Sequence, residues 1–179
     1  RTGQGQYIDL SQAESALHLM SPALLEYSIN GNIWERNGNR DRVFAPQGGY
    51  PTSGQDSWIA ISCKDDDQWA QLAKEIKRDD LADLPLDERH NRHDELDSLI
   101  SSWTAQADGV ELMERLQALG VPAHIVQNSP ELSVDPQMMH RGLFEEVIHA
   151  THEPFFVDGT RFHMSRTPAQ ITHSGPTFG

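Results

Sequence analysis

The chain has 179 residues, and its 27 acidic residues outnumber 14 basic ones to give a formal net charge of −13. This balance argues against a nucleic-acid partner, because phosphate backbones are bound by clustered Lys and Arg side chains. Hydrophobic residues make up 37% of the sequence, and no apolar run approaches the roughly 20 residues of a membrane-spanning helix, so a transmembrane segment is not expected. A single cysteine, Cys63, allows no internal disulfide; we expect a half-buried, unreactive thiol in a reducing, cytoplasmic protein.

The first 36 residues predict a short strand followed by a helix. Residues 7–10 alternate apolar and polar side chains, and Ser11 with Glu14 forms the capping-box pattern that begins a helix. Pro22 is expected to bend or split this helix, and Gly31 to end it. The sequence opens with a polar turn and without Met, so we expect a fragment of a longer polypeptide.

Residues 37–62 predict a linker that leads into a second folding unit. Turn-forming residues are dense at 37–40 and again at 46–49, and an apolar run of strand length follows at 58–61. Two adjacent glycines allow backbone amides to approach a ligand closely or to stabilise a developing oxyanion. The alternative is a plain turn between domains. The candidate substrate loop consists of Pro46, Gln47, Gly48, Gly49 and Tyr50.

Residues 48–127 predict a small α/β domain built from a strand, three helices and a strand. The first strand covers 58–63, and Asp65 is expected to cap the helix behind it. A second helix is expected from near Glu88 or Asn91, and a third is capped by Asp108. A strand at 121–126 closes the unit. The predicted core stripes are Trp69, Leu72, Ala73, Ile76; Leu96, Leu99, Ile100, Trp103; and Val110, Met113, Leu116, Leu119.

Residues 128–179 predict short elements without a core of their own. A turn leads into a short helix at 133–139, and 143–149 is typical of a strand. Asp158 and the following glycine favour a tight hairpin between strands at 155–157 and 160–164. These strands would have to pack on the residues before 37 or on a domain outside this chain.

The histidines give weak chemical signals. His90 and His93 can share a helix face near Asp94 and Glu95, but no Cys or further His completes a known metal pattern, so no metal site is predicted. A surface role is expected for the pair His149 and His152. His140 and Arg141, beside a glycine, are candidates for anion binding. Nucleophile-elbow, phosphate-loop and dinucleotide-binding motifs are all missing from the sequence.

Five segments in order resemble the carboxyl-terminal part of family III CoA-transferases, the CaiB/BaiF group that includes acyl-CoA racemases. They are RTGQGQYIDLS, NGNR with APQGGY and WIAIS, WTAQADGVELMERLQALGVPA, DPQMMHRG, and the closing SRTP with GPTFG. The resemblance implies a Rossmann-like large domain interrupted by a small α/β domain, with two subunits interlocked. Residues 1–47 and 128–179 would then be return segments of the large domain, and 48–127 the small domain.

The resemblance also implies a reaction. In family transferases an aspartate attacks an acyl-CoA thioester and later carries CoA as its own thioester before the acceptor carboxylic acid reacts. That aspartate precedes the segment matching residues 1–6, so no catalytic residue is assigned in this chain. Acyl-CoA and carboxylic acids would be substrates, with no covalent cofactor. Racemase activity of the parent protein, or a purely structural or dimerisation role for this chain, stay as alternatives. The family's active-site glycine loop falls near 46–49.

Overall fold

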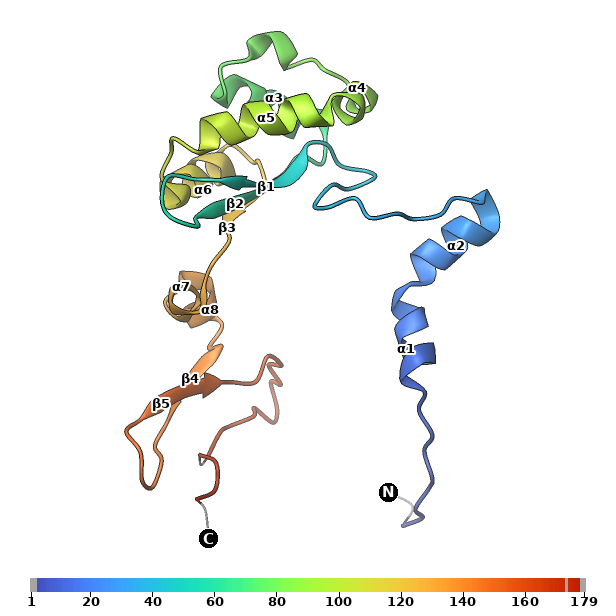
Figure 1. Cartoon of the computed structure of the whole chain (residues 1–179). Helices are drawn as coiled ribbons and strands as arrows, with labels where there is room; N and C mark the ends of the chain where they lie inside the picture. Colours follow the sequence, from blue (N-terminus) through green and yellow to red (C-terminus); the bar gives the residue numbers. More distant parts are fainter. Residues whose placement is uncertain (1–2, 173, 178–179) are drawn as a thin grey trace.

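The computed structural model describes residues 3–172 and 174–177, so the outermost residues of the first and last family segments lie outside it. A three-stranded antiparallel sheet forms the centre, with strands β1 (Gln47–Pro51), β2 (Trp58–Ser62) and β3 (Ala123–Ile125) in that order. Figure 1 shows helices over one side of this sheet, the amino-terminal helices reaching away from it, and the carboxyl-terminal elements hanging from β3. The structure is therefore a mixed α/β fold.

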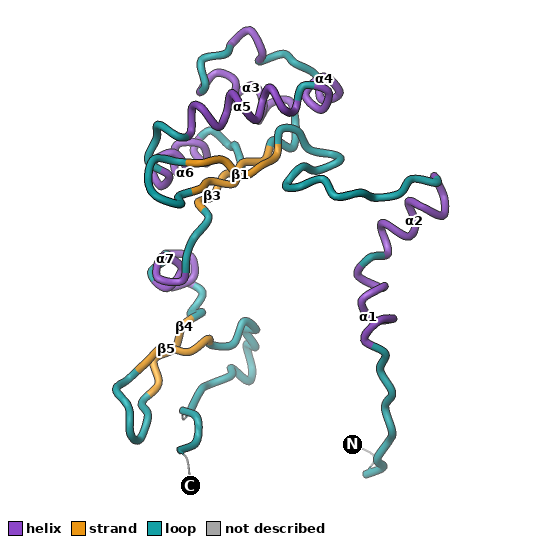
Figure 2. The backbone as a smooth tube through the Cα atoms, in the orientation of Figure 1, coloured by secondary structure: helices purple, strands orange, loops and turns teal. Residues whose placement is uncertain are grey.

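The sheet has one buried face and one open face. In β2, Ile59 and Ile61 are buried whereas Trp58 and Ala60 are exposed, as expected when successive side chains point to opposite faces. Figure 2 shows the three strands beneath the helices. The strands predicted at 58–63 and 121–126 are confirmed as β2 and β3, and β1 is an additional strand in the segment for which a loop is predicted.

Helices lie over the sheet, and the first and last of them begin at an aspartate side-chain cap. They are α3 (Asp66–Glu75), α4 (Leu86–Asn91), α5 (His93–Thr104) and α6 (Gly109–Ala118), with a short 3-10 turn at Asp79–Leu81. The Asp65 side chain accepts a hydrogen bond from the Gln68 amide at 2.9 Å, and Asp108 caps α6 as predicted. The fully buried side chains include Trp69, Leu72, Ala73, Leu96, Ile100, Leu112 and Leu116.

Two helix predictions need correction. The expected second helix is split into α4 and α5 at Arg92. In α6 the buried face is set by Leu112 and Leu116, whereas Val110 is 46% exposed. The physical reason is a close approach at Gly109, where an added Cβ would lie 3.2 Å from Ile125 on β3. This contact turns the 109–112–116 side of α6 toward the sheet.

The amino-terminal segment forms two helices. Helix α1 (Gln12–Leu19) is capped by Ser11, and α2 (Ser21–Asn30) carries Pro22 in its first turn, so the predicted split is confirmed. Gly31 ends α2 with φ +73°, as expected. The predicted strand at residues 7–10 was wrong: among the residues that the structure describes no strand pairs with it, and its side chains are exposed. Neither helix contains a buried residue.

The carboxyl-terminal segment contains α7 (Ser129–Ser133), α8 (Pro136–His140), β4 (Phe144–Val147) and β5 (Phe155–Asp158). The predicted hairpin was wrong in its partner. Strand β5 pairs antiparallel with β4, and residues 160–164 form no strand. The Gly159 amide donates to the Leu143 carbonyl at 2.6 Å and ends this pairing instead of starting a turn.

The carboxyl-terminal strands do not pack on the residues before 37, because Figure 1 shows these two parts of the chain on separate sides of the molecule. The core cluster runs from Tyr50 to Ala123. The division into 1–47, 48–127 and 128–179 stays a prediction. Within the described residues, no helix is both long enough and apolar enough to cross a membrane.

Candidate functional site

A depression of about 810 Å³ lies on the open side of the sheet. The linker residues Gly38, Asn39 and Arg40 form one wall, and strands β1, β2 and β3 all contribute to the remainder. An adjoining hollow of about 480 Å³ shares the same linker residues and reaches Asp97 on α5. The linker therefore lies along the β1 edge of the sheet and borders both spaces.

Small residues form the floor of the depression. The strand register places Gly49 opposite Ala60, and Ala60 opposite His124 on β3. This row crosses all three strands, and its first two members carry no side chain or only a methyl group. Because these side chains are so small, the surface between β1 and β3 is recessed, and the His124 imidazole stands at its β3 end.

Gly48 makes room for the ring of Tyr50. A Cβ built at Gly48 would lie 2.9 Å from both Cζ and Oη of Tyr50, closer than real Cβ contacts. The Tyr50 side chain is buried, and its hydroxyl donates to Asp97 Oδ1 at 2.9 Å. Burial, followed by the nearby Asp97 charge, raises the pKa of Tyr50, so the phenol stays a protonated donor.

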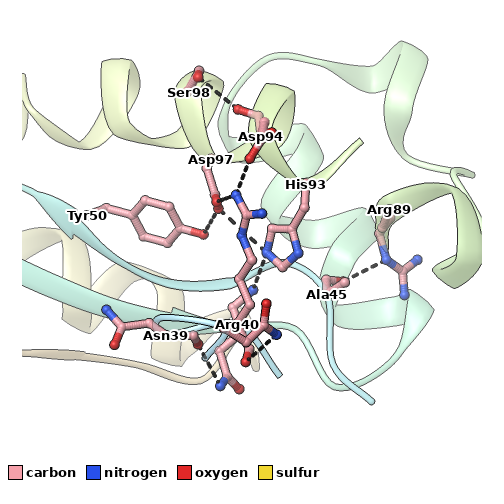
Figure 3. A network of polar contacts seen from close by, with 11 residues as sticks. Asn39, Arg40, Ala45, Tyr50, Arg89, His93, Asp94, Asp97 and Ser98 are labelled. Carbon is pink, nitrogen blue, oxygen red and sulfur yellow. Dashed lines mark hydrogen bonds and ion pairs between the residues drawn. The ribbon is translucent and has the colours of Figure 1, made fainter. Parts of the chain in front are cut away.

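Asp97 connects the sheet, α5 and the linker. Arg40 Nη2 donates to Asp97 Oδ2 at 2.9 Å and also to Asp94, as Figure 3 shows. The Arg40 hydrogen bond and charge hold the pKa of Asp94 below its usual range. Two carboxylates thus fix the linker to α5 and offset the charge of Arg40.

Two further contacts join the linker to the strands. His93 is buried, and burial lowers its pKa; the neutral ring accepts a long hydrogen bond from the Gln47 amide at 3.5 Å. The Gln47 side chain donates to the Asn39 carbonyl at 3.1 Å and accepts from Ser62 Oγ at 2.9 Å. The main chain of Asn39 is therefore held against β1.

The structure changes the interpretation of the predicted substrate loop. Residues 47–51 are strand β1, in which Gly48 pairs with Ile61 and Gly49 with Ala60. The expectation of a glycine loop at 46–50 was therefore wrong in conformation, because antiparallel pairing with β2 orders this segment. Contact of these residues with substrate stays a prediction; Gln47, Gly48 and Gly49 do border the depression.

The remaining sequence candidates lie elsewhere. His140 and Arg141 are exposed at the end of α8 and do not border the depression, and their anion binding stays a prediction. Residues 3–172 and 174–177 contain no group of three or more His, Cys, Asp or Glu side chains placed to hold a metal ion. Cys63 is fully buried instead of half-buried, and burial raises its pKa to about 12.

Sequence reasoning missed four residues of this site: Asn39, Arg40, Asp97 and His124. The contacts of Asp97 with Tyr50 and Arg40 span 47 and 57 positions in the sequence, so no local motif marks them. The sequence offers one signal for this site. Gly48 and Gly49 stand directly before the large side chain of Tyr50, which indicates a place where an aromatic ring packs closely against the backbone.

Comparison with known proteins gives the family. The sequence profile of CoA-transferase family III matches residues 1–179. The chain belongs to CoA-transferase family III. This family III chain is 31% identical over 187 residues to a succinyl-CoA–D-citramalate CoA-transferase of Chloroflexus aurantiacus, covering 100% of the chain and 45% of that protein. It is 29% identical over 170 residues to a succinyl-CoA:mesaconate CoA-transferase of Haloarcula hispanica, covering 93% of the chain and 42% of that protein.

Solved structures show the same fold. A CaiB/BaiF family protein from Brucella suis superposes on 98% of this family III chain with a TM-score of 0.82 at 23% identity, and 46% of that protein is covered. A hypothetical protein from Mycobacterium tuberculosis superposes with a TM-score of 0.62 at 22% identity, covering 98% of the chain and 55% of that protein. The family III chain thus spans about half the length of the relatives it matches.

Proposed function

We propose that the protein containing this chain is an acyl-CoA:carboxylate CoA-transferase. The observation that carries the proposal is the match to curated CoA-transferases along the whole chain, among them enzymes named for succinyl-CoA with D-citramalate and with mesaconate. The family's racemases are the second candidate from the sequence. The named relatives favour transfer.

The proposed reaction proceeds through a carboxylate nucleophile outside this chain. The carboxylate attacks the thioester carbonyl of the donor and expels CoA thiolate, which forms a mixed anhydride. The thiolate then attacks the enzyme's acyl carbonyl, so that CoA is held as an enzyme thioester and the donor acid leaves. The acceptor carboxylate repeats these two steps in reverse and departs as the new acyl-CoA.

In this proposal the described chain supplies a wall of the substrate site. The row of Gly49 and Ala60 leaves space above the sheet, and the contacts of Arg40 and Gln47 fix the linker beside that space. Such ordered groups hold a substrate in one orientation while the nucleophile reacts. The chain by itself is expected to be inactive.

The test is to incubate the full-length protein with succinyl-CoA and a panel of carboxylic acids, and to identify CoA thioesters by mass spectrometry. New thioesters that depend on the added acid support the proposal. A folded full-length protein that forms none contradicts it. Deuterium entering the α-carbon of an acyl-CoA without any acceptor would instead indicate a racemase.

The interlocked homodimer implied by the family is part of the same proposal. Both α1 and α2 contain no buried residue, and large apolar side chains on them, such as Leu25 and Tyr27, are exposed. Sedimentation of the full-length protein is expected to give twice the mass of one chain. A monomer would contradict this part of the proposal and leave the reaction class untouched.

A further inference from the structure

A buried histidine stands where the linker is attached to the sheet and to α5. His93 is the first residue of α5, and only 5% of its side chain is exposed. Its Nε2 accepts a hydrogen bond from the Gln47 amide at 3.5 Å and lies 3.7 Å from Asp97 Oδ1. One ring nitrogen therefore faces both the start of β1 and the carboxylate that holds Arg40, as Figure 3 shows.

The hydrogen bond from Gln47 requires a neutral His93 ring. A ring nitrogen that accepts a hydrogen bond carries no hydrogen, so the hydrogen of the neutral ring is on Nδ1. A second proton has to enter at Nε2. There it points at the Gln47 N–H, and two donors do not bond to each other. Protonation of His93 thus breaks this contact between α5 and β1.

The surroundings of the His93 ring oppose a proton overall. Burial is the largest influence, and it lowers the pKa of His93. The nearby carboxylates and the Gln47 main chain favour the proton, whereas the linker guanidinium and a second imidazole oppose it. The titratable and charged groups around the ring are Asp94 and Asp97 of α5, His90 of α4, Arg40 of the linker and Tyr50 of β1.

The attachment of the linker depends on the same groups. Arg40 Nη2 donates to Asp97 Oδ2 at 2.9 Å, and Gln47 Nε2 donates to the Asn39 carbonyl at 3.1 Å. A charged His93 ring attracts the Asp97 carboxylate away from Arg40 and no longer accepts from the Gln47 amide. Protonation at one nitrogen therefore weakens both attachments together.

We propose that His93 acts as a pH-sensitive latch on the linker: residues 38–47 are held while the ring is neutral and released when it is protonated. In the closed latch, residues 38–40 form one wall of the depression and of the adjoining hollow. Opening the latch removes this wall. The inference concerns the linker alone and does not depend on the reaction of the whole protein.

The direction of the pH dependence follows from the two positions of the linker. With the latch open, the His93 ring meets water and titrates near its ordinary pKa of about 6.5. With the latch closed, burial keeps the pKa of the same ring lower. The closed form is therefore fully favoured above about pH 6.5 and loses this advantage as the pH falls toward the lower pKa. The open population should rise by up to about tenfold between about pH 7.5 and 5.5.

Hydrogen–deuterium exchange of the full-length protein measures the opening. The exchange rate of an amide, divided by its intrinsic rate at the same pH, reports the population of the open form. For amides between residues 40 and 47 this ratio should rise by up to about tenfold from about pH 7.5 to 5.5. Amides of α6 are the internal reference and should keep their ratio. An unchanged ratio at residues 40–47 would overturn the inference.

A variant without the titrating ring tests the role of His93 itself. In His93→Gln the side chain keeps an acceptor for the Gln47 amide but takes up no proton, so the ratio should be the same at both pH values. His149→Gln is the matched control, since His149 lies beyond β4, and it should show the native rise. A rise that persists in His93→Gln, or that disappears in His149→Gln, would overturn the latch.

A second variant decides the question even where His93→Gln does not fold. Arg40→Gln removes the guanidinium that Asp94 and Asp97 hold, and it leaves His93 in place. Exchange between residues 40 and 44 should then be fast at both pH values, because the linker is released throughout. Native protection in Arg40→Gln, with the native response to pH, would show that the linker is not held in this way and would overturn the latch.

Discussion

Replacing Gly48 by Ala perturbs the site at one methyl group. The new Cβ would lie 2.9 Å from two atoms of the Tyr50 ring, and this ring is buried with its hydroxyl held by Asp97. Relief requires the ring to move, which strains the packing by about 1–3 kcal/mol. Weakening the bond to the Asp97 carboxylate adds about 1.5–3 kcal/mol. The smaller backbone entropy of unfolded Ala offsets about 0.4–1 kcal/mol. We expect a net destabilisation of about 1.5–5.5 kcal/mol.

Gly49→Ala is the matched control for this prediction. Its added Cβ would lie 3.4 Å from Asn39 Nδ2, an ordinary contact, and neither glycine has a positive φ. The same entropy effect should therefore leave Gly49→Ala unchanged or stabilised by up to about 1 kcal/mol. Urea unfolding followed by tryptophan fluorescence measures both variants. Equal unfolding midpoints for the two variants would refute the argument that Gly48 exists to accommodate Tyr50.

Three further predictions concern groups around this sheet. Tyr50→Phe removes the hydroxyl that donates to Asp97 and is expected to lower the free energy of unfolding by about 1.5–3 kcal/mol. Urea unfolding measures this change, and an unchanged urea midpoint would contradict the hydrogen bond. Arg89, fully buried, donates to the carbonyls of Ala45 and Leu84 and to the exposed carboxylate of Asp66. Arg89→Met leaves the two carbonyls without this donor and should destabilise by about 2–6 kcal/mol in the same assay. Near-native stability would show that these carbonyls find other donors. Burial raises the pKa of Cys63 to about 12 from about 8.5 in the unfolded chain, so its contribution to stability is complete below pH 8.5 and is lost between pH 8.5 and 12. The thermal unfolding midpoint of Cys63→Ala should therefore fall less steeply between about pH 8.5 and 12 than that of the native chain. Parallel plots of midpoint against pH for the two proteins would exclude the Cys63 thiol as a cause of the loss of stability.

Elements with strong local signals could be predicted from the sequence. The caps at Asp65 and Asp108, the break at Pro22 and the stop at Gly31 were all confirmed, because each depends on residues within one helical turn. Strand β2 was confirmed within one residue for a related reason, since its alternation reflects a sheet with one buried face.

The missed features depend on distant partners. Gln47–Pro51 contains two glycines and a proline, which are depleted in strands, and it is a strand because β2 supplies its hydrogen bonds. The Asp158-Gly159 turn signal was outweighed by pairing of β5 with β4. The site was hidden for the same reason, because Arg40 meets Asp97 only after α5 has folded across the sheet.

The attachment of Arg40 to α5 also has a mechanical consequence. Residues 38–40 are tied to the sheet and to α5, whereas α2 ends at Asn30 and no residue of the helix is buried. Any rotation of α1 and α2 relative to the sheet must then be absorbed between residues 31 and 37. Residues 31–37 would then act as a hinge, with Arg40 on its fixed side and the two amino-terminal helices on its moving side. Rotation of the two helices about this hinge would leave residues 38–40, which border the depression beside Gly49, in place.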